Sequence, residues 1–553
     1  MKKITGRSAF LSILKDEGIT HLFGNPGTTE LPIMHALKEF PEITYILGLQ
    51  ESIVVAMADG YSRATGKLSA CNVHVTPGLG NSMGAIYNAQ FVGSPIIITA
   101  GQQEQGHGLM EPQLSGPLVQ IAEPLVKWAI EVTRLEDLPR IMRRAAKIAL
   151  APPTGPVFIS LPGDILNTEG VIDLGAVTRV KDNIIPDKET VLEIIKKIIN
   201  SNNPVIVSGH EIACTNAFKE ITKFSEITGA PVYQQTVPHG SHYPSEHQNF
   251  MGFLPKNQKQ VKNILEKYDL LICLGGDVLR MSVWDENESL PNGMSIIQIG
   301  IRDWEIGKNY ATELAILGNV KSSLNIINNT LLEQKDSEFL QNSSLRINKI
   351  KKENWSHKKK KLVNTTEKYR SIKPIKPEWL MLKITENLPE NYVIVEEGLV
   401  STRALLNYLP IKQHNDFYGL ASGGIGWAIS GAIGVSIANP DKTIIAIIGD
   451  GSSMYAIQSL WTAAHYNFNI IYIIANNSGY RIIKERLEAF HNNKNFIGMD
   501  FKNPPIDFVK LSESMGIPAT RIDDPEKISN TIQNATKNKG PQLLDIILDN
   551  GYE

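Results

Sequence analysis

The sequence has little cysteine and no excess of charge of either sign. Its three cysteines, Cys71, Cys214 and Cys273, lie far apart among 553 residues, so neither a disulfide framework nor a CxxC metal site is indicated. The 55 basic residues are balanced by 57 acidic ones, and a formal net charge of -2 gives no overall attraction to nucleic acid or to an anionic membrane. Partners therefore have to be predicted from individual sites.

Long apolar runs are also missing. The longest nearly apolar segment, Gly426 to Ala438, is too short to span a bilayer. Polar residues interrupt the apolar ones that follow Lys2 and Lys3, so no signal-peptide core forms. Together with the low cysteine content, these absences predict a cytoplasmic protein that has no contact with a membrane.

The length and the strand pattern predict several α/β domains. A chain of this length exceeds a single hydrophobic core and corresponds to about three or four units. Short β-branched runs alternate with helical patterns, which is typical of parallel sheets covered by helices. We predict three doubly wound parallel-sheet domains at 1–182, 183–340 and 374–553, with a linker at 341–373. The clearest strand sequences are ITYILGL, SPIIITAG, GPVFISLP, NPVIVSG, DLLICLGG, TIIAIIGD and NIIYIIANN.

The linker contains a dense basic run, RINKIKKENWSHKKKK, at 346–361. Such a run is compatible with a nucleic-acid or lipid patch. Acidic residues such as Glu353 and Glu367 dilute it, and the total charge of the chain is balanced. A solvated linker helix between two domains is therefore the favoured interpretation.

The strongest local signal is a strand, helix, strand pattern. TIIAIIGDGSSM (443–454) precedes a helical stretch, and NIIYIIANNSGY (469–480) follows it. Asp450 and Asn477 are expected just past the carboxyl ends of the two strands, where parallel sheets bind ligands. Their side-chain oxygens and a free carbonyl at Gly479 suit Mg²⁺, which keeps coordination places for phosphate and water.

The small residues around Asp450 suit a diphosphate. Gly449 and Gly451 allow a close approach of the backbone. We expect Ser452 or Ser453 to cap the following helix, whose N-terminal amides favour a phosphate group. Taken alone, GDG is a common turn sequence and NN is simply a turn, but their combination is far more specific.

GDG at 449–451 with NN at 476–477 resembles the cofactor-binding motif of the thiamine diphosphate enzymes. The resemblance implies that Mg²⁺ is bound by Asp450, Asn477 and the Gly479 carbonyl. It also implies a thiamine diphosphate cofactor, whose two phosphates complete the metal site.

Two further segments are interpreted through the same resemblance. In the glycine-dense segment ASGGIGWAISGAIG (421–434), Ile425 matches the residue that wedges between the two cofactor rings. The Gly423 carbonyl then accepts a hydrogen bond from the aminopyrimidine amino group. In EEGLVST, Leu399 and Val400 are expected near the diphosphate. The structural alternative for the glycine-dense segment is a close helix crossing through small residues.

The cofactor also requires a carboxylate. Its aminopyrimidine can remove the weakly acidic thiazolium proton only once the ring nitrogen is protonated. Glu51, in ILGLQESIVVAMADGY, follows an apolar strand and starts a helix whose first turns are almost entirely apolar. Burial there favours sharing a proton with the ring. The structural alternative is a first-turn glutamate that stabilises the helix dipole.

The N-terminal third resembles the benzoylformate decarboxylase group of this family. The matching segments are FGNPGTTELP, LQESIVVAMADGY, NVHVTPGLGNSMGAIYNA and ITAGQQ, in that order. The resemblance implies that Glu51 is the activating carboxylate and His74 an active-site acid or base. It further implies that Thr28 offers a hydroxyl to the substrate and that Asn81 belongs to the cofactor site.

His74 has a structural alternative, since a lone histidine before a glycine-rich segment is usually a hydrogen-bonded structural residue. It ends the short strand CNVH and precedes VTPGLGN, expected as a loop that faces the same cleft as Glu51. An imidazole there can protonate or orient an oxyanion near neutral pH. We favour the functional interpretation.

The resemblance weakens in the central unit, where GGDVLRMSVWDEN places Ser282 near the position of a second active-site histidine. The proton transfer that releases the aldehyde then lacks its expected donor. His107, His239 and His242 are candidates to replace it, but the sequence does not place them.

A second departure follows the metal motif. In YRIIKERLEAFHNNKNF, Arg486 stands where the aromatic decarboxylases offer a phenylalanine to the substrate ring. It either binds a second acidic group on the substrate or pairs with Glu485 or Glu488 in solvent. We favour the solvent interpretation, and benzoylformate itself is then in doubt as the substrate.

The resemblance implies non-oxidative decarboxylation of a 2-oxo acid. CO₂ leaves, and the thiazolium ring accepts the electron pair of the broken bond. Glu51 and Asp450 are expected to hold opposite ends of one cofactor from different domains, and the resemblance implies that each site spans two subunits of a homodimer or homotetramer. The main alternative is a carboligase of the acetolactate synthase type, which often carries FAD in its central domain.

Two other classes are weaker. A nucleotide-binding or NAD-dependent module lacks support, because no GxGxxG follows a strand with an acidic residue about 20 positions later. A non-catalytic relative that only binds the cofactor is disfavoured by the intact Glu51.

Overall fold

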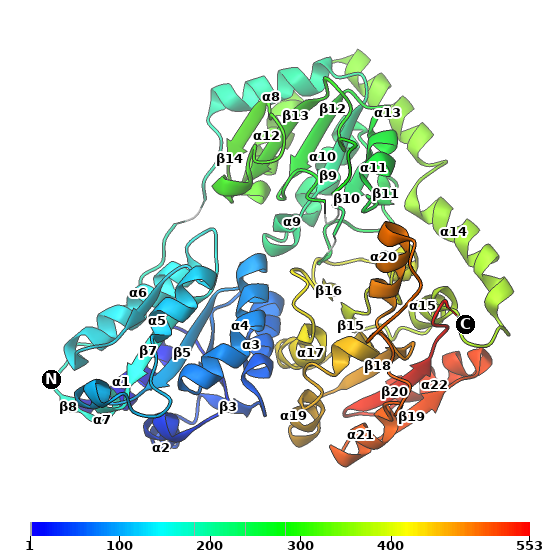
Figure 1. Ribbon diagram of the computed structural model, residues 1–553. Coiled ribbons are helices and arrows are strands. Elements are labelled where there is room, and N and C mark those ends of the chain that lie inside the picture. Colours follow the sequence, from blue (N-terminus) through cyan, green and yellow to red (C-terminus); the bar gives the residue numbers. More distant parts are fainter. Residues whose placement is uncertain (1–2, 182, 238, 282–283, 553) are drawn as a thin grey trace.

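The computed structural model describes residues 3–181, 183–237, 239–281 and 284–552. It consists of three α/β units, each built on a six-stranded parallel sheet (Figure 1). The predicted fold class is thereby confirmed. The domain boundaries near 182, 340 and 374 stay predictions, and Asp182 itself lies outside the described residues.

The N-terminal unit has the strand order β3-β2-β4-β5-β7-β6, with a small antiparallel pair, β1 and β8, at its edge. Its elements are β1 (Ile4–Thr5), α1 (Gly6–Asp16), β2 (His21–Gly24), α2 (Leu31–Leu37), β3 (Thr44–Leu47), α3 (Glu51–Thr65), β4 (Ser69–Val73), α4 (Val75–Val92), β5 (Ile96–Gln102), α5 (Leu118–Ala122), β6 (Ala129–Glu131), α6 (Leu138–Leu150), β7 (Val157–Pro162), α7 (Gly163–Asn167) and β8 (Glu169–Gly170).

The central unit has the strand order β11-β10-β9-β12-β13-β14. Its elements are α8 (Lys188–Asn200), β9 (Pro204–Ser208), α9 (Glu211–Cys214), α10 (Phe218–Thr228), β10 (Val232–Gln234), β11 (Phe250–Phe253), α11 (Gln258–Leu265), β12 (Leu270–Leu274), β13 (Ser295–Gly300), β14 (Leu314–Leu317) and α12 (Val320–Gln334).

The C-terminal unit has the strand order β16-β15-β17-β18-β20-β19. Its elements are α15 (Pro377–Glu386), β15 (Tyr392–Glu397), α16 (Leu405–Tyr408), β16 (Phe417–Gly419), α17 (Trp427–Ala438), β17 (Thr443–Gly449), α18 (Asp450–Ser453), α19 (Ser459–His465), β18 (Ile470–Asn476), α20 (Arg481–His491), α21 (Phe508–Ser514), β19 (Ala519–Ile522), α22 (Ile528–Lys537) and β20 (Gln542–Ile547).

Apolar residues on both faces explain why the predicted strands lie inside the sheets. All seven residues of β18 are buried, as are five of the seven in β17. Strands of a parallel sheet covered by helices on both sides show continuous rather than alternating apolar runs. Each of the seven strand sequences singled out above contains one strand of a parallel sheet.

The basic run of the linker is divided between two helices, α13 (Ser337–Ile350) and α14 (Trp355–Thr366), which connect the central and C-terminal units (Figure 1). Trp355 is 3% exposed, and its indole nitrogen donates to the Leu406 carbonyl at 3.0 Å. The run is therefore carried by two linker helices, one of which is anchored, rather than by a single helix. No helix of the described residues is long and apolar enough to cross a membrane.

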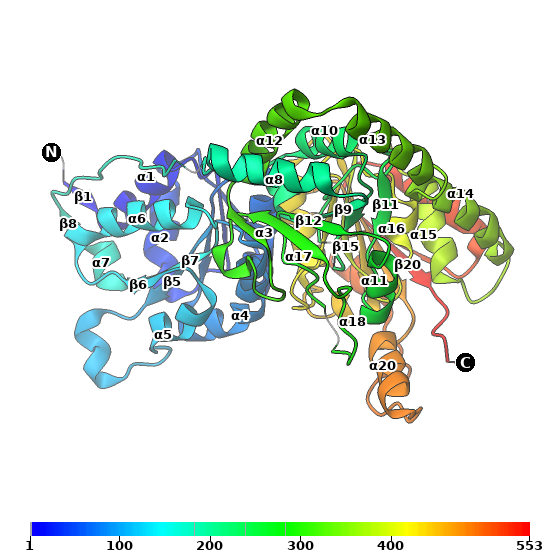
Figure 2. The same cartoon turned by 90° about the horizontal axis from the view of Figure 1, so that it is seen from above.

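The N- and C-terminal units are joined by close packing of α3 against α17, which lie side by side in Figures 1 and 2. A β-carbon on Gly434 would come within 2.0 Å of the Met57 carbonyl oxygen, and one on Gly60 within 2.2 Å of the Gly431 carbonyl oxygen. These pairings run in opposite directions along the two helices, so the helices are antiparallel. The close helix crossing expected as the structural alternative for the glycine-dense segment is thus present.

We expect Gly434→Ala to lower the thermal midpoint of unfolding by about 2 °C or more, because the added methyl group meets backbone atoms that cannot rotate away. Differential scanning calorimetry measures this shift. Gly106→Ala is the matched control, since a β-carbon there has nothing within 4 Å. Equal midpoints for the two variants would contradict the proposed tightness of the crossing.

Candidate functional site

Glu51 is the first residue of α3 and is only 7% exposed. Its carboxylate accepts hydrogen bonds from the side-chain amides of Asn25, at 3.2 Å, and Asn81, at 3.0 Å. A β-carbon on Gly78 would lie 3.2 Å from the Glu51 side chain, so glycine lets α4 approach it. The structure therefore brings together Glu51 and Asn81. The sequence analysis missed Asn25, although it directly follows strand β2.

His74 lies between β4 and α4 and is held by a buried carboxylate. Its Nδ1 is 2.7 Å from Oε2 of Glu30, which is 1% exposed, and 3.3 Å from the Thr29 hydroxyl. The backbone amides of Gly27 and Gly101 each donate to Glu30 at 2.9 Å. A β-carbon on Gly27 would come within 2.2 Å of the imidazole. Glu30, which the sequence analysis missed, thus fixes the orientation of His74.

The prediction that VTPGLGN forms a loop is wrong, because α4 begins at Val75, directly after His74. Pro77 lies in the first helical turn, where its missing N–H leaves no intrahelical bond unmade. Val75 has a φ of +45°, which is a strained conformation for a β-branched residue. Backbone strain is thus concentrated beside the predicted active-site histidine.

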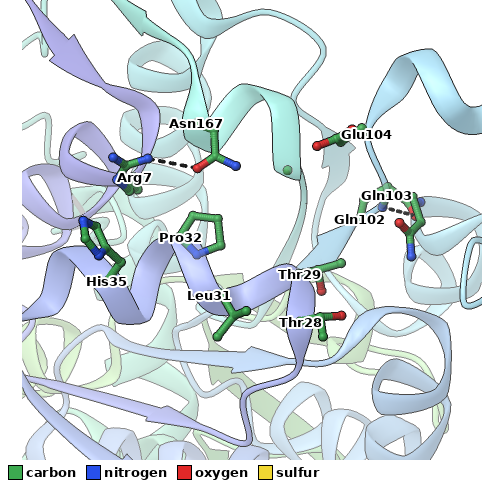
Figure 3. Close-up of a pocket in the computed structure, with 11 residues that line it drawn as sticks. Arg7, Thr28, Thr29, Leu31, Pro32, His35, Gln102, Gln103, Glu104 and Asn167 are labelled. Atoms are coloured by element: carbon green, nitrogen blue, oxygen red, sulfur yellow. Dashed lines mark hydrogen bonds between the residues drawn. The ribbon is translucent and has the colours of Figure 1, made fainter.

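Thr28 begins a short 3-10 helix, Thr28–Glu30, and is exposed. It lines a cavity of about 520 Å³ at the edge of the N-terminal sheet (Figure 3). Its neighbour Thr29 contacts His74, so Thr28 lies on the same side of the unit as the imidazole. The other residues that line this cavity are Arg7, Leu31, Pro32, His35, Gln102, Gln103, Glu104, Gly163 and Asn167.

Asp450 and Asn477 occupy the carboxyl ends of the adjacent strands β17 and β18, as predicted. The Asp450 carboxylate accepts from the amides of Gly451 (2.9 Å) and Gly479 (3.0 Å), and burial raises its pKa to about 6. The Asn477 amide nitrogen donates to the Ser401 hydroxyl at 3.1 Å. Its Oδ1 is buried and has no hydrogen-bond partner among the described residues.

This donor set fits a magnesium ion. A buried amide oxygen without a partner is rare and requires an explanation, and a cation is one. Asp450 adds a carboxylate, and the Gly479 carbonyl accepts only the Arg481 amide, at 3.1 Å, among the described residues. Oxygen ligands of these kinds are the ones that Mg²⁺ prefers.

The predicted serine cap is wrong. Helix α18 starts at Asp450, its N-cap is Gly449, and no side chain caps it. The Ser453 hydroxyl instead donates to the Asp450 carbonyl at 2.8 Å, and Ser452 lies near a buried glutamate, Glu397. The GDG turn begins the helix before either serine is reached, so neither can occupy the capping position.

Two side chains that the sequence analysis missed hold the segment before α17. The Asn88 amide donates to the Gly424 carbonyl at 2.6 Å. Glu397, which is fully buried, accepts from the backbone amides of Gly426 at 2.5 Å and Ala428 at 2.6 Å. Burial raises the pKa of Glu397 to about 8, against the smaller opposing effect of these hydrogen bonds. The segment that carries Ile425, the residue predicted to wedge between the cofactor rings, is therefore held by hydrogen bonds on both sides.

The remaining predicted cofactor residues gather near the same edge of the C-terminal sheet. Leu399 follows β15 with a φ of +51° and is 41% exposed, whereas Val400 is buried. Both line a cavity of about 730 Å³ between the central and C-terminal units. Gly423, at φ +88°, and Leu399 also line a neighbouring cavity of about 350 Å³. Ile425 is partly buried between Gly423 and the start of α17.

The favoured solvent pairing of Arg486 is not formed. Glu485 instead binds Arg403 at 3.0 Å and Arg481 at 3.1 Å, and the structure shows no ion pair from Arg486 to Glu488 among the described residues. Arg486 lines the 730 Å³ cavity. Its helix, α20, protrudes from the C-terminal unit (Figure 2).

The three candidate replacement histidines occupy different environments. His107 lies on an exposed 3-10 turn, whereas His239 and His242 are buried in the central unit. His239 lines the 350 Å³ cavity together with Gly423. Ser282, where the second active-site histidine was expected, lies outside the described residues.

The group around Glu51 and the group around Gly423 lie at opposite ends of the α3 and α17 pair. Glu51 begins α3, whereas Arg63, near its other end, lies 4.3 Å above the ring of Trp427, the first residue of α17. Twelve residues of α-helix span roughly 18 Å. Within one chain the two groups therefore do not meet.

A hydrogen bond between the N- and C-terminal units shows that Glu51 is also distant from the predicted metal ligands of its own chain. The Leu47 amide, at the end of the strand before Glu51, donates to the Tyr466 hydroxyl at 3.0 Å. Tyr466 precedes β18, and Asn477 follows the opposite end of that strand. Seven residues of strand span roughly 23 Å. Glu51 thus lies beside the amino edge of the C-terminal sheet, while Asp450 lies at its carboxyl edge.

Comparisons with known proteins identify the family of this chain. Three family models match: the N-terminal TPP binding domain of thiamine pyrophosphate enzymes at residues 4–115, the central domain at 191–327 and the C-terminal TPP binding domain at 400–546. A benzoylformate decarboxylase from Pseudomonas aeruginosa is 30% identical over 98% of both chains. A probable acetolactate synthase large subunit from Methanococcus aeolicus is 28% identical, over 99% of this chain and 92% of that protein.

The fold is shared with solved structures of the same kind. A thiamine diphosphate-dependent 4-hydroxybenzoylformate decarboxylase from Rhodococcus jostii superposes with a TM-score of 0.88, at 28% identity and over 99% of both chains. The family models together match well over half of the chain, and the similarity to these relatives extends along nearly all of it. The chain therefore belongs to the family of thiamine pyrophosphate enzymes.

Proposed function

We propose that this protein decarboxylates a 2-oxo acid with thiamine diphosphate and Mg²⁺ and releases an aldehyde. The observation that carries the proposal is the Glu51 carboxylate, buried at a helix N-terminus and held by the amides of Asn25 and Asn81. A structural first-turn glutamate does not need two side-chain amides to orient it. The bound cofactor supplies an electron sink for the bond to CO₂.

The metal and diphosphate end is assigned to the C-terminal unit. Asp450, Asn477 and the Gly479 carbonyl would hold Mg²⁺, and the unpaired Oδ1 of Asn477 supports this assignment. Five residues at the carboxyl edge of the sheet would supply the backbone near the diphosphate. These residues are Leu399, Val400, Gly449, Gly451 and Ser452.

Residues of both the N-terminal and the C-terminal unit would bind the aminopyrimidine ring of the cofactor. Glu51 would share a proton with the ring nitrogen of the aminopyrimidine, and Asn81 would keep the carboxylate in place. The Gly423 carbonyl would accept from the amino group of that same ring, while Ile425 supports its bend. The fixed position of this segment, held by Asn88 and Glu397, supports the role.

These two contacts explain why we propose that a second copy of the chain completes the site. Glu51 and Gly423 would bind one ring, yet within one chain Glu51 begins α3, whereas Gly423 precedes α17, whose first residue lies beside Arg63 near the other end of α3. Glu51 of one protomer would therefore meet Gly423 and Asp450 of its partner. The smallest assembly with complete sites is a dimer with two-fold symmetry.

The surface of the isolated chain supports this assembly. Its accessible area is 23389 Å², whereas a compact monomer of 61.2 kDa is expected to expose about 19,700 Å². Leu109 and Met110, at the end of the 3-10 segment Gln105–Met110, are 98% and 75% exposed. Apolar side chains this exposed are typical of surfaces that another chain covers.

His74 is proposed to move protons on the substrate. Its Nδ1 is bound to Glu30, so its Nε2 is the atom available to a substrate oxygen. Thr28 would contact the substrate carboxylate or carbonyl from the adjoining cavity.

We expect Glu30→Gln to lower kcat/KM about 10-fold to 100-fold, because the imidazole loses the carboxylate that orients it. In a His74→Ala background the same change should have little further effect, since both residues then act through one group. Steady-state kinetics of the four proteins tests this, and the affinity for the cofactor should be unchanged in all of them. Independent, multiplicative losses would indicate that Glu30 is merely structural.

The substrate is proposed to carry an acidic group at its far end. Arg486 and Lys256 line the 730 Å³ cavity beside Leu399, and burial lowers the pKa of Lys256. An anionic substituent there would pair with the partly buried Arg486 and with Lys256. Arg486→Phe is therefore expected to raise turnover of benzoylformate relative to an acid such as 2-oxoglutarate.

The experiment that tests the function is CO₂ release with product identification by mass spectrometry. The panel contains benzoylformate, pyruvate and 2-oxoglutarate, with and without thiamine diphosphate and Mg²⁺. Aldehyde formed only with both cofactors supports the proposal. Absence of turnover on every acid, although the cofactor is bound, would refute it.

The second candidate is a carboligase of the acetolactate synthase type. The similarity to a probable acetolactate synthase large subunit over 99% of this chain favours it. In the same experiment, acetolactate or acetoin from pyruvate instead of acetaldehyde would select this alternative, and a yellow protein containing FAD would support it.

A further inference from the structure

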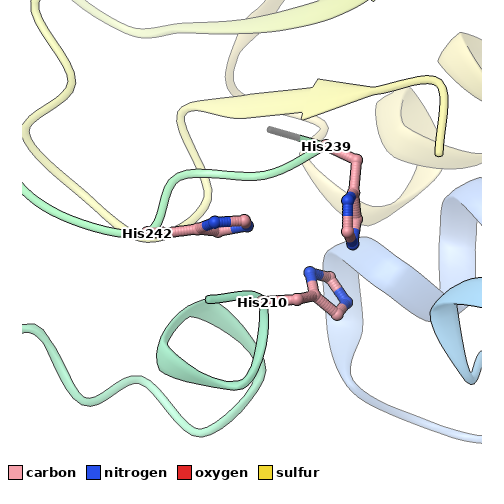
Figure 4. A group of neighbouring side chains, drawn as sticks. All are labelled: His210, His239 and His242. Atoms are coloured by element: carbon pink, nitrogen blue, oxygen red, sulfur yellow. The ribbon is translucent and has the colours of Figure 1, made fainter. Parts of the chain in front are cut away.

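Three histidines of the central unit lie together, and none of them is among the residues proposed to bind the cofactor or its Mg²⁺. His210 precedes α9, and His239 and His242 lie in the segment between β10 and β11. Figure 4 shows the three rings facing a common space. One ring nitrogen from each lies within 4.8 Å of the others. His239 is 6% exposed and His242 is fully buried.

The hydrogen bonds of these rings leave at least one nitrogen atom of each ring available. Nε2 of His210 lies 3.1 Å from the Cys214 sulfur, whereas its Nδ1 is buried and has no partner among the described residues. Nδ1 of His239 lies 3.3 Å from the Val237 carbonyl, which leaves its Nε2. His242 has no hydrogen-bond partner of normal geometry on either ring nitrogen within the described chain.

This pattern is unusual for a structural cluster. Buried polar atoms without partners are costly, and three neutral imidazoles side by side cannot satisfy one another completely. A metal ligand, by contrast, uses one ring nitrogen and donates from the other to a carbonyl or similar group. His239, with its Nδ1 at the Val237 carbonyl, has this second arrangement.

The three rings are also in the protonation state that a metal requires. Burial lowers the pKa of each, that of His242 to about 3 and those of His210 and His239 well below the usual value. Neutral imidazole is the form that binds a metal.

The nearby charges select the kind of cation. The Arg63 guanidinium donates to the His239 carbonyl at 2.7 Å, and Arg302 also lies close enough to lower the pKa of His210 and His239. These groups oppose a cation that is bound mainly by charge, such as Mg²⁺ or Ca²⁺. They are less unfavourable to a metal that gains most from imidazole bonds, such as Zn²⁺, Ni²⁺ or Cu²⁺.

We propose that His210, His239 and His242 form a three-histidine site for a late first-row transition metal of the Zn²⁺ class. Ligand nitrogens in a tetrahedral zinc site lie about 2.0 to 2.1 Å from the ion, so small rotations of the rings close the present separation. His210 and His239 also line the 350 Å³ cavity, which leaves a fourth coordination position on that side for water. The site shares no ligand with the proposed Mg²⁺ site of Asp450 and Asn477.

The location gives this metal a structural consequence. The Arg63 side chain, from the end of α3, binds the carbonyls of both His239 and Gly419, and the Gly419 amide donates to the His239 carbonyl at 3.1 Å. All three units therefore meet at His239. A metal here would stabilise their junction, so the thermal midpoint is expected to rise when Zn²⁺ is added.

The test is metal binding by the full-length holoenzyme. Protein freed of transition metals by a chelator is loaded with thiamine diphosphate and saturating Mg²⁺, and Co²⁺ is then titrated. We expect about one equivalent per chain with the intense visible absorption of tetrahedral cobalt, removed by competing Zn²⁺. His242→Gln and His210→Gln should lose this absorption, whereas His35→Gln, on the exposed face of α2, should retain it.

A second variant separates this site from the diphosphate site. Asp450→Asn should retain the cobalt absorption in full, because it changes only the Mg²⁺ ligands. Circular dichroism confirms that each variant is folded, and a Zn²⁺-dependent rise in the thermal midpoint should occur in the wild-type protein but not in His210→Gln. Failure to bind Co²⁺ or Zn²⁺ more tightly than about 100 μM, or full binding by both histidine variants, would overturn the proposal.

Discussion

Replacement of Glu51 by glutamine is expected to lower kcat about 1,000-fold or more, while the affinity for the cofactor changes only a few-fold. The amide has nearly the shape of the carboxylate and can still bind one of the two asparagines, but it cannot share a proton with the ring nitrogen. Loss of a positioned acid or base costs about 100-fold to 10,000-fold. CO₂ release measures kcat, and a cofactor titration at fixed Mg²⁺ measures binding.

Two control variants are compared with Glu51→Gln. Glu51→Asp keeps the charge but withdraws it by one methylene, so an intermediate rate is expected. Glu39→Gln, at an exposed position near the end of α2, should leave kcat unchanged. Wild-type kcat in Glu51→Gln would remove Glu51 from the mechanism and leave only its role at the helix N-terminus.

Two inactive variants are expected to restore activity when they are combined in one oligomer. Glu51→Gln damages the N-terminal half of a site, and Asp450→Ala damages the C-terminal half. In a mixed dimer with shared sites, one site carries both changes and the other carries neither. Random mixing then yields about one quarter of the wild-type activity, because half of the dimers are mixed and half of their sites are intact.

The two variants are best co-expressed with different affinity tags and purified through both tags in sequence. The mixed dimers alone should then reach about half of the wild-type activity. A double variant that carries both changes on one chain is co-expressed with the wild-type chain as the converse test. Each shared site of such a mixed dimer carries one change, so the mixed dimers should be inactive. Failure of the mixed dimers to exceed the activity of the single variants would show that each site lies within one chain.

Strand-end reasoning predicted the parts of the site that lie close together in the sequence. Asp450 and Asn477 follow neighbouring strands of one βαβ unit, and Glu51 follows a strand and starts a helix. Glycine content and apolar runs suffice to predict this local geometry, and the carboxyl edge of a parallel sheet then gathers the side chains. The three parallel sheets were predicted for the same reason.

The sequence did not predict the residues that hold the site in place. Glu30 reaches His74, and Asn88 reaches Gly424, across long stretches of chain that only the folded sheet and helices bring together. Glu397 adjoins a segment assigned to the diphosphate, but its burial depends on how α17 packs. No spacing rule connects such pairs, because the register between distant elements is set by the packing of the whole unit.

The two local errors have a different cause. VTPGLGN contains proline and two glycines and was therefore interpreted as a loop, but proline is tolerated in a first helical turn and Gly78 is needed beside Glu51. The serines after GDG have the composition of a helix cap, but the helix begins at Asp450. In both segments glycine allows close packing: Gly78 lies beside Glu51, and a β-carbon on Gly451 would come within 2.6 Å of the Tyr480 ring.

The antiparallel crossing of α3 and α17 has a consequence for communication within the proposed dimer. One end of α3 would belong to one active centre, and Trp427, beside its other end, would belong to the second centre. Because the glycine contacts hold α3 and α17 tightly together, the two helices would move as one rigid body between the two centres. A tilt of α3 caused by events at one cofactor would displace the Gly423 segment at the other, so the two centres would turn over in a correlated rather than an independent manner.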